Sequence, residues 1–109
     1  MKLLTRSEEF LLLAIWRLQN NAYGVTIREQ LKESTGKSWA FGALFVSLDR
    51  LVKKGFLQSH LSDPTPERGG RSKRMYRLTD EGMKALLEVK QVEKKMWADL
   101  PNLAPEKTK

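Results

Sequence analysis

The amino-acid sequence predicts a mainly α-helical domain that carries one small β-hairpin, and two observations lead to this prediction. Apolar residues recur at helical spacing in three segments before residue 55 and in a fourth after residue 79. Between these helical parts, two short segments of strand character flank a stretch that holds two prolines and two glycines. With 109 residues, the chain has the length of a single domain.

The composition excludes several classes of function. The chain has no cysteine and one histidine, His60, so disulfides, thiolate metal sites and His/Cys clusters are excluded. No pair of acids, nucleophile with a base, or metal-ligand spacing indicates a catalytic centre, so we expect no enzyme activity, cofactor or metal. The longest apolar run, 10–16, is too short to span a bilayer, and Glu8 and Glu9 interrupt any signal peptide, which favours the cytoplasm.

The first predicted helix runs from about Thr5 to Asn21. Thr5 and Glu8 have the spacing of a capping box, and a long apolar run follows at once. The apolar residues of this run cover more than one helical face, whereas a surface helix shows a single stripe. We therefore expect this helix to be buried on two sides, one of them against another subunit.

The second predicted helix spans 25–34. Thr26 and Glu29 repeat the capping-box spacing near its start. Gly36 follows directly and is expected to end the helix, because glycine readily adopts the left-handed conformation found after helix ends.

The third predicted helix has the most regular periodicity in the chain, with Ser38 as its expected N-cap and Gly55 as its terminator. Its predicted apolar face consists of Phe41, Leu44, Phe45, Leu48, Leu51 and Val52. The opposite face is made mostly of small or hydrogen-bonding side chains, which lets another molecule approach closely. That face consists of Trp39, Gly42, Ala43, Val46, Ser47 and Arg50.

Two strand-like segments, 56–61 and 74–78, form the predicted hairpin around a long basic tip. Thr79 then opens a fourth helix, since a cap residue precedes two acids in its first turn. The helix is expected to run to about Leu100, because Pro101 stops it. A helix this long and this apolar, placed after the core has closed, needs a partner.

The charge is unevenly distributed along the chain. Lysine and arginine total 20 against 13 acidic residues, a net charge of +7, and residues before Thr79 hold 14 basic and 7 acidic side chains. Three helices followed by a basic hairpin is the order of a winged helix-turn-helix, whose third helix lies in the major groove while the wing contacts phosphates or the minor groove. The predicted DNA-binding residues are Lys37, Ser38, Trp39, Ala43, Arg50, Arg68, Gly69, Gly70, Arg71, Lys73 and Arg74.

Three sequence segments together resemble the PadR family of bacterial transcriptional regulators. They are Tyr23-Gly24-Val25-Thr26-Ile27, the stretch 42–51 with Gly55-Phe56-Leu57, and the stretch 74–82. The resemblance runs from about Phe10 to Leu87, and it implies a homodimeric winged-helix repressor. Because one helix follows the wing, the chain resembles the short-tailed subfamily, in which that helix packs on the first helix of the partner. Phe45 departs from the family's usual tyrosine and is not counted as a DNA ligand.

The resemblance also indicates which residues meet in the dimer. Some short-tailed members bind flat hydrophobic effectors between tryptophans of the last helices, and Trp97, with Ile15 and Gln19 as lining, is the candidate for such a pocket. The simpler interpretation, which we favour, is that Trp97 anchors the interface, as buried aromatic side chains commonly do. The predicted dimer-interface residues are Leu11, Ile15, Leu86, Val89, Val92, Met96 and Trp97.

These features divide the chain into a DNA-binding domain at 1–78, a dimerisation helix at 79–100 and a flexible tail at 101–109. The favoured function is a repressor that occludes its promoter, with two recognition helices ~34 Å apart on a pseudo-palindromic operator. The alternative is a basic winged-helix module that binds structured RNA or a protein partner. An isolated RNA-binding module does not need the apolar stripe of the last helix, so dimer formation discriminates between the two.

Overall fold

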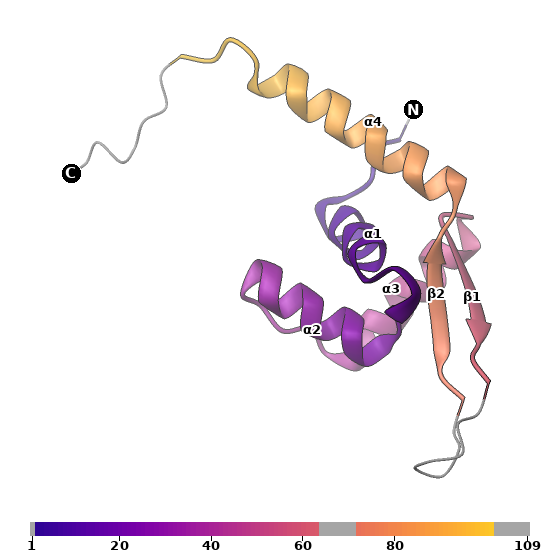
Figure 1. Ribbon diagram of the computed structural model, residues 1–109. Coiled ribbons are helices and arrows are strands. Elements are labelled where there is room, and N and C mark those ends of the chain that lie inside the picture. Colours follow the sequence, from indigo (N-terminus) through magenta and orange to yellow (C-terminus); the bar gives the residue numbers. More distant parts are fainter. Residues whose placement is uncertain (1, 64–71, 102–109) are drawn as a thin grey trace.

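The computed structural model describes residues 2–63 and 72–101. Within them the chain folds as helices around one antiparallel hairpin (Figure 1), which confirms the predicted fold class. The elements are α1 (Arg6–Leu18), the 3-10 helix η1 (Gln19–Asn21), α2 (Gly24–Thr35), α3 (Phe41–Lys53), β1 (Leu57–Leu61), β2 (Arg74–Leu78) and α4 (Asp80–Trp97).

The start of α1 is the capping box expected from the sequence. The Thr5 hydroxyl accepts a hydrogen bond from the Glu8 N–H at 3.1 Å, and the Glu8 carboxylate accepts one from the Thr5 N–H at 2.8 Å. Lys54, just after α3, donates to the same carboxylate at 2.6 Å. Partial burial acts to raise the pKa of Glu8, but the hydrogen bonds from Lys54 and Thr5 outweigh it and hold that pKa below its ordinary value. Glu8 therefore joins the start of α1 to the end of α3 as a carboxylate.

The start of α2 differs from the prediction. The expected capping box of Thr26 and Glu29 is wrong, because α2 already begins at Gly24. Thr26 lies in the first turn, where its hydroxyl accepts from the Tyr23 N–H at 3.0 Å and donates to the Asn21 carbonyl at 2.6 Å. The predicted end is confirmed, since Gly36 caps α2 in the left-handed conformation with φ of 80°.

The start of α3 also differs, and this changes the candidate site. The expected cap at Ser38 is wrong: α3 begins at Phe41 after Ala40, whose backbone is extended. The reason lies one residue earlier, because Trp39 packs against the core and its carbonyl accepts from the Arg28 Nε at 2.6 Å. Residues 37–39 therefore form a connection between α2 and α3 instead of a first helical turn. Gly55, with φ of 85°, follows the end of α3 as predicted.

The core lies between the first three helices and the hairpin. α1 contributes one buried side to it, while Leu13 and Trp16 on its other side are 40% and 48% exposed. Within one subunit, α1 is therefore buried on one side only. Each large apolar side chain removed from water stabilises the fold by about 1.5–3 kcal/mol. The fully buried large side chains are Leu11, Leu12, Ile15, Ile27, Leu31, Leu44, Leu48, Leu51 and Leu57.

The hairpin is tied to the helices through β2. β1 and β2 pair antiparallel, from Leu57 opposite Leu78 to Leu61 opposite Arg74. On its other edge, β2 bonds to the residues after η1: the Tyr76 N–H donates to the Ala22 carbonyl at 2.9 Å, and Met75 forms a bridge with Tyr23. These bonds fix the direction in which the hairpin leaves the helical body (Figure 1).

α4 begins in the same core and then leaves it. Thr79 caps it by accepting from the Gly82 N–H at 3.0 Å, and Gly82 packs so closely on the Phe56 carbonyl that no side chain would fit. Leu86 and Val89 are buried, and an ion pair of 2.6 Å joins Glu93 to Arg6 of α1. The helix ends at Trp97, three residues before the predicted end.

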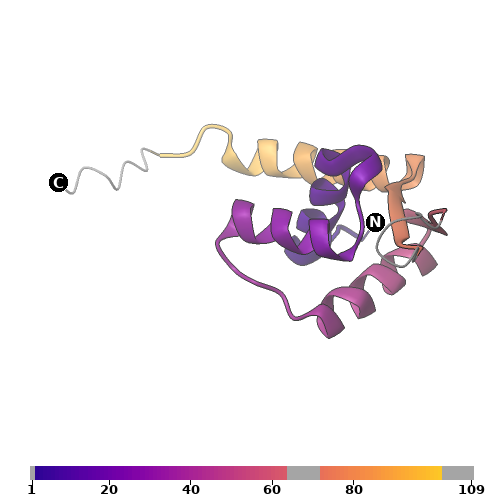
Figure 2. The same cartoon turned by 60° about the horizontal axis from the view of Figure 1, so that its bottom comes forward.

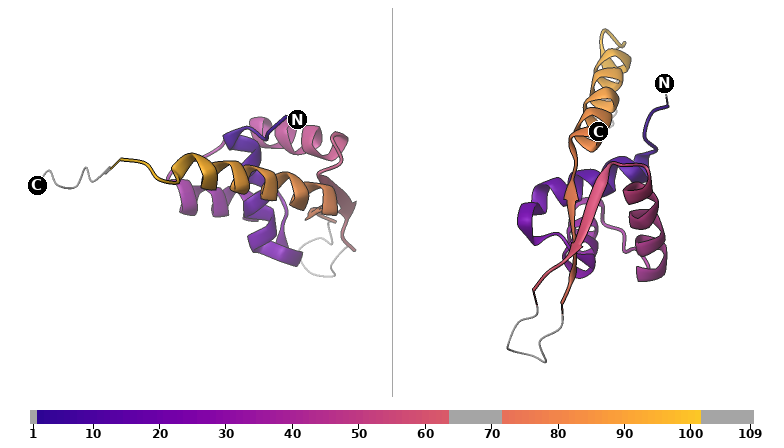
Figure 3. Two further views of the ribbon diagram at one scale, coloured as in Figure 1. Left: turned by 90° about the horizontal axis from the view of Figure 1, so that it is seen from above. Right: turned by 90° about the vertical axis from the view of Figure 1, so that its right-hand side faces the viewer.

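The helices α3 and α4 lie on different sides of the molecule. α4 lies across the side of the molecule opposite α3 (Figure 2), and its C-terminal half extends past the other helices (Figure 3). Among the residues that the structure describes, no helix combines the length and the apolar character that crossing a membrane requires.

Candidate nucleic-acid interface

The side of α3 that faces away from the core forms the centre of the candidate interface. Gly42, Ala43, Val46 and Arg50 follow each other at helical spacing on this side, and all four are exposed. The N-cap residue Ala40 makes no side-chain hydrogen bond to the first turn, so backbone N–H groups there can donate to a phosphate oxygen. Arg50 makes no ion pair within residues 2–63 and 72–101, neither with Asp49 nor with Glu29. Its side chain is exposed.

Arg28 of α2 positions the start of α3. Its Nε donates to the Trp39 carbonyl at 2.6 Å, and its guanidinium lies 4.6 Å from the centre of the Phe41 ring. Arg28 is not among the residues predicted to bind DNA. Spacing alone contains no signal for its role, because the hydrogen-bond partner is 11 residues away in the chain.

Two phenylalanines continue this support along α3. Phe41 and Phe45 stack with ring centres 6.0 Å apart, and the Phe45 ring lies against Gly24, where a Cβ would come within 2.8 Å of it. Phe41 and Phe45 are 40% and 41% exposed, so the predicted apolar face of α3 is only partly buried. The pair sets the contact between α2 and α3.

The connection before α3 contains three predicted DNA-binding residues, and they differ in accessibility. Lys37 and Ser38 are exposed, whereas Trp39 is half-buried against the core. None of the three lies in the helix, so they are not the first residues of a recognition helix, contrary to the prediction. Trp39 holds the connection in place, and Lys37 and Ser38 remain accessible at its surface.

The loop-side end of the hairpin, where Leu61 pairs with Arg74, carries two further predicted ligands, Lys73 and Arg74. The Lys73 ammonium lies 4.4 Å from the centre of the Tyr23 ring, while Arg74 donates to the Ser59 hydroxyl at 3.1 Å. Both side chains are exposed. The other predicted wing residues, Arg68, Gly69, Gly70 and Arg71, lie outside the described residues.

Tyr76, two residues after Arg74, is buried at 3% exposure. Burial raises the pKa of its phenol, and the negative charge of Asp49 raises it further, against a smaller opposite effect of Arg74. The phenol is therefore neutral at physiological pH. Asp49 of α3 and Arg74 of β2 both act electrostatically on this buried group.

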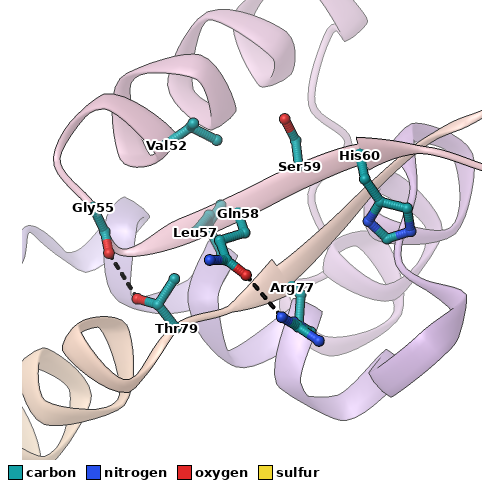
Figure 4. A pocket seen from close by; sticks show the side chains of 8 residues that line it. All are labelled: Val52, Gly55, Leu57, Gln58, Ser59, His60, Arg77 and Thr79. Atoms are coloured by element: carbon teal, nitrogen blue, oxygen red, sulfur yellow. Dashed lines mark hydrogen bonds between the residues drawn. The ribbon is translucent and has the colours of Figure 1, made fainter.

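A polar hollow lies beside β1 and the start of α4 (Figure 4). In it, Arg77 donates to the Gln58 carbonyl oxygen at 2.8 Å, and the Thr79 hydroxyl donates to the Gly55 carbonyl at 2.7 Å. His60 is exposed on β1, as expected of a strand surface residue. The first bond joins the two strands, and the second joins the N-cap residue of α4 to the turn after α3.

A second surface, formed by α1 and α4, is apolar. The exposed large side chains on it are Leu13 and Trp16 of α1, Leu87, Met96 and Trp97 of α4, and Leu100. A hollow of about 380 Å³ lies between the two helices, with Leu13, Trp16, Met83 and Leu87 in its lining. We call this the α1–α4 surface.

The predicted dimer-interface residues divide between this surface and the core. Leu11 and Ile15 are 0% and 1% exposed, because α1 turns them toward α2 and α3, and no partner can reach them. Leu86 and Val89 are also buried, and Val92 is half-buried. Met96 and Trp97 are exposed. Leu13 and Trp16, which the sequence analysis did not select, replace Leu11 and Ile15 as the accessible apolar residues of α1.

The three residues considered for an effector pocket do not come together within the subunit. Ile15 lies in the core, Gln19 follows the end of α1, and Trp97 lies at the far end of α4. The Gln19 amide donates to the Trp16 carbonyl at 2.6 Å.

Comparison with known proteins gives a consistent result. A model of the transcriptional regulator PadR-like family matches residues 12–88, and no curated protein matches the chain. RosR from H. salinarum is 28% identical with a TM-score of 0.66, over 89% of this chain and 81% of that one. A PadR family transcription regulator from hypervirulent Clostridium difficile is 25% identical with a TM-score of 0.66, over 82% and 88%.

A PadR-like transcriptional regulator from Bacillus cereus has the same fold, with a TM-score of 0.68 at 22% identity over 83% of this chain and 82% of that one. The matched family and these named regulators are transcription factors, not enzymes.

Proposed function

The chain belongs to the transcriptional regulator PadR-like family, and we propose that this DNA-binding regulator acts as a homodimeric, sequence-specific repressor. In this proposal residues 1–78 bind DNA, residues 79–100 hold the dimer together, and residues 101–109 form a tail. The repressor occludes its promoter while bound.

The α3 side of the molecule supports the DNA-binding part of the proposal. Its exposed face is narrow and carries small side chains up to Arg50, so it fits into a major groove. In this proposal Lys37, Ser38 and Ala43 contact the groove or its phosphates, and Lys73 and Arg74 at the loop-side end of the hairpin add positive charge. Arg68, Gly69, Gly70 and Arg71 of the wing extend the contact along the phosphate backbone.

The observation that carries the homodimer is the exposure of Met96 and Trp97 at 69% and 67%. Both lie on the half of α4 that extends past the other helices (Figure 3). Large apolar side chains at this exposure lose stabilisation that burial against a second copy would supply. In the proposed dimer, α4 of one subunit covers Leu13 and Trp16 of the other, and Trp97 anchors the contact.

Such a dimer has α4 on the side opposite α3, which leaves both recognition helices free. Two recognition helices about one helical turn of DNA apart, or ~34 Å, read a pseudo-palindromic operator. Anything that binds one arrangement of the two subunits more tightly than another shifts this distance and relieves repression.

Sedimentation equilibrium of the intact chain at micromolar concentration tests this proposal, first alone and then with a duplex chosen from a random library. We expect a dimer in both cases, with two chains for each duplex. A stable monomer would overturn the repressor proposal. Equal competition by a structured RNA hairpin of the same length would favour the basic RNA-binding module in its place.

A further inference from the structure

The middle of the exposed α3 face is apolar. Val46 is 57% exposed, the most exposed large hydrophobic side chain of α3. One turn before it lie Gly42 and Ala43, and one turn after it Asp49 and Arg50. Around Val46, the N-terminal half of this face therefore offers methyl groups and no side-chain hydrogen-bonding group.

The fold does not use the Val46 side chain. The buried residues of α3, Leu44, Leu48 and Leu51, lie on the opposite side of the helix. Ser47, the nearest hydroxyl, is half-buried and lines a hollow beside the start of α1 together with Glu8 and Arg50. Because the Val46 side chain does not pack in the core, it is available to contact a ligand.

The charged residues near Val46 indicate which kind of ligand it contacts. Arg50 and Lys53 lie on α3 and Lys37 in the connection before it, and all three side chains are exposed. A basic surface of this kind complements a phosphate backbone. Inside the major groove, the one apolar group on a base edge is the C5-methyl of thymine, which protein side chains recognise by apolar contact.

We propose that Val46, together with Ala43, is a specificity-determining residue that reads thymine C5-methyl groups in the operator. This inference rests on the proposed function, because it requires α3 to lie in the major groove. In this inference two residues of α3 have different roles. Val46 discriminates thymine by its methyl group, and Arg50, one turn later, supplies the hydrogen bonds or the phosphate contact.

Deoxyuridine provides the test, since it differs from thymidine only by that methyl group. A half-site selected from a random duplex library is resynthesised with each thymine replaced in turn by deoxyuridine. We expect wild-type affinity to fall about fourfold at one or two neighbouring positions in each half-site, the size expected for one buried methyl group. Val46→Ala should lose this sensitivity at the same positions while it keeps its affinity for phosphates, measured by the salt dependence of binding.

Val25→Ala is the matched control, because Val25 is an exposed valine of α2 at 47% exposure. This variant should keep the wild-type response to deoxyuridine. If wild type binds the selected duplex and no deoxyuridine changes its affinity by more than about twofold, Val46 does not read thymine and the inference is overturned, with the DNA-binding proposal intact. A selected half-site without thymine overturns it equally, and failure to bind any duplex overturns both proposals.

Discussion

Two surfaces of the molecule can be compared: the surface formed by α3 and the hairpin, and the α1–α4 surface. They differ in how well contacts within one subunit support them. On the first, Arg28 and Gly24 of α2 support α3, and bonds to Ala22 and Tyr23 support β2. On the second, the last turns of α4 expose Met96 and Trp97 and extend past the other helices. The first surface is therefore shaped within one subunit, whereas the second is completed by another chain only in the dimer that we propose.

The strongest test of this comparison places a charge on the incomplete surface. Met96→Asp should abolish the dimer at micromolar concentration, because a partner cannot bury an unpaired carboxylate without a large desolvation cost. DNA affinity should fall about 100-fold or more in the same variant, since binding through two linked half-sites is lost. Val92→Asp should act in the same direction. Sedimentation and a gel-shift titration measure the two effects.

Gln91→Asp is the matched control on the polar side of α4, where Gln91 is exposed. It adds the same charge and should leave both dimer and DNA binding intact. A Met96→Asp protein that stays dimeric would contradict the proposed interface.

The next test removes charge from the other surface. Replacing Arg68 and Arg71 with alanine should weaken binding to every duplex, whatever its sequence. Each phosphate contact contributes about 0.9 to the slope of log affinity against log salt, so the slope should become shallower by about two. The dimer should be unchanged. A slope equal to that of wild type would mean that the wing does not contact phosphates.

Local sequence signals predicted most of the elements. The capping box at Thr5 and the left-handed glycines after α2 and α3 depend on residues close together in the chain, and each strand is recognised from its own short segment. The start of α3 could not be predicted in this way. Ser38 has the chemistry of a cap, but the position of Trp39 in the core and its bond to Arg28 determine where the helix begins.

In the candidate site, too, some features could be predicted from the sequence and others could not. Periodicity separates the inner and outer faces of α3 correctly at Leu44, Leu48 and Val46. In α1 it fails, because the seven consecutive apolar residues 10–16 offer two equally apolar sides. Which side packs inward is decided by α2, α3 and β2, so Leu11 and Ile15 became core residues and Leu13 and Trp16 became surface residues.

Arg28→Met tests whether the α3 surface is supported from within. The substitution removes a charged hydrogen bond to the Trp39 carbonyl and the contact with the Phe41 ring, so we expect about 1–2 kcal/mol of lost stability. DNA binding should weaken while the dimer persists. Denaturant unfolding measures the first effect. Lys32→Met, which removes an exposed charge from the same helix, should change stability by less than about 0.5 kcal/mol.

The pH dependence of stability tests the contact between α1 and α3. The pKa of Glu8 is lowered in the folded state, so its carboxylate stabilises the fold above the ordinary glutamate pKa of about 4.3. This stabilisation is lost as pH falls through the lower, folded pKa. Glu8→Gln should therefore be less stable than wild type at pH 7. The difference in the free energy of unfolding should shrink as the pH falls below about 5. A difference that is the same at pH 7 and about pH 3 would rule out this role.

The smallest effect concerns Gly42, where the fold and the proposed function make opposite demands. A Cβ at this position would meet no other group within 4 Å, so glycine here has no packing reason. Because glycine costs about 0.5–1 kcal/mol relative to alanine inside a helix, Gly42→Ala should stabilise the protein by up to that amount. If α3 lies as closely against DNA as we propose, the added methyl group should at the same time weaken operator binding. A variant that is more stable and binds as well as wild type would place Gly42 outside the contact, and would restrict the recognition surface to the turns that carry Val46 and Arg50.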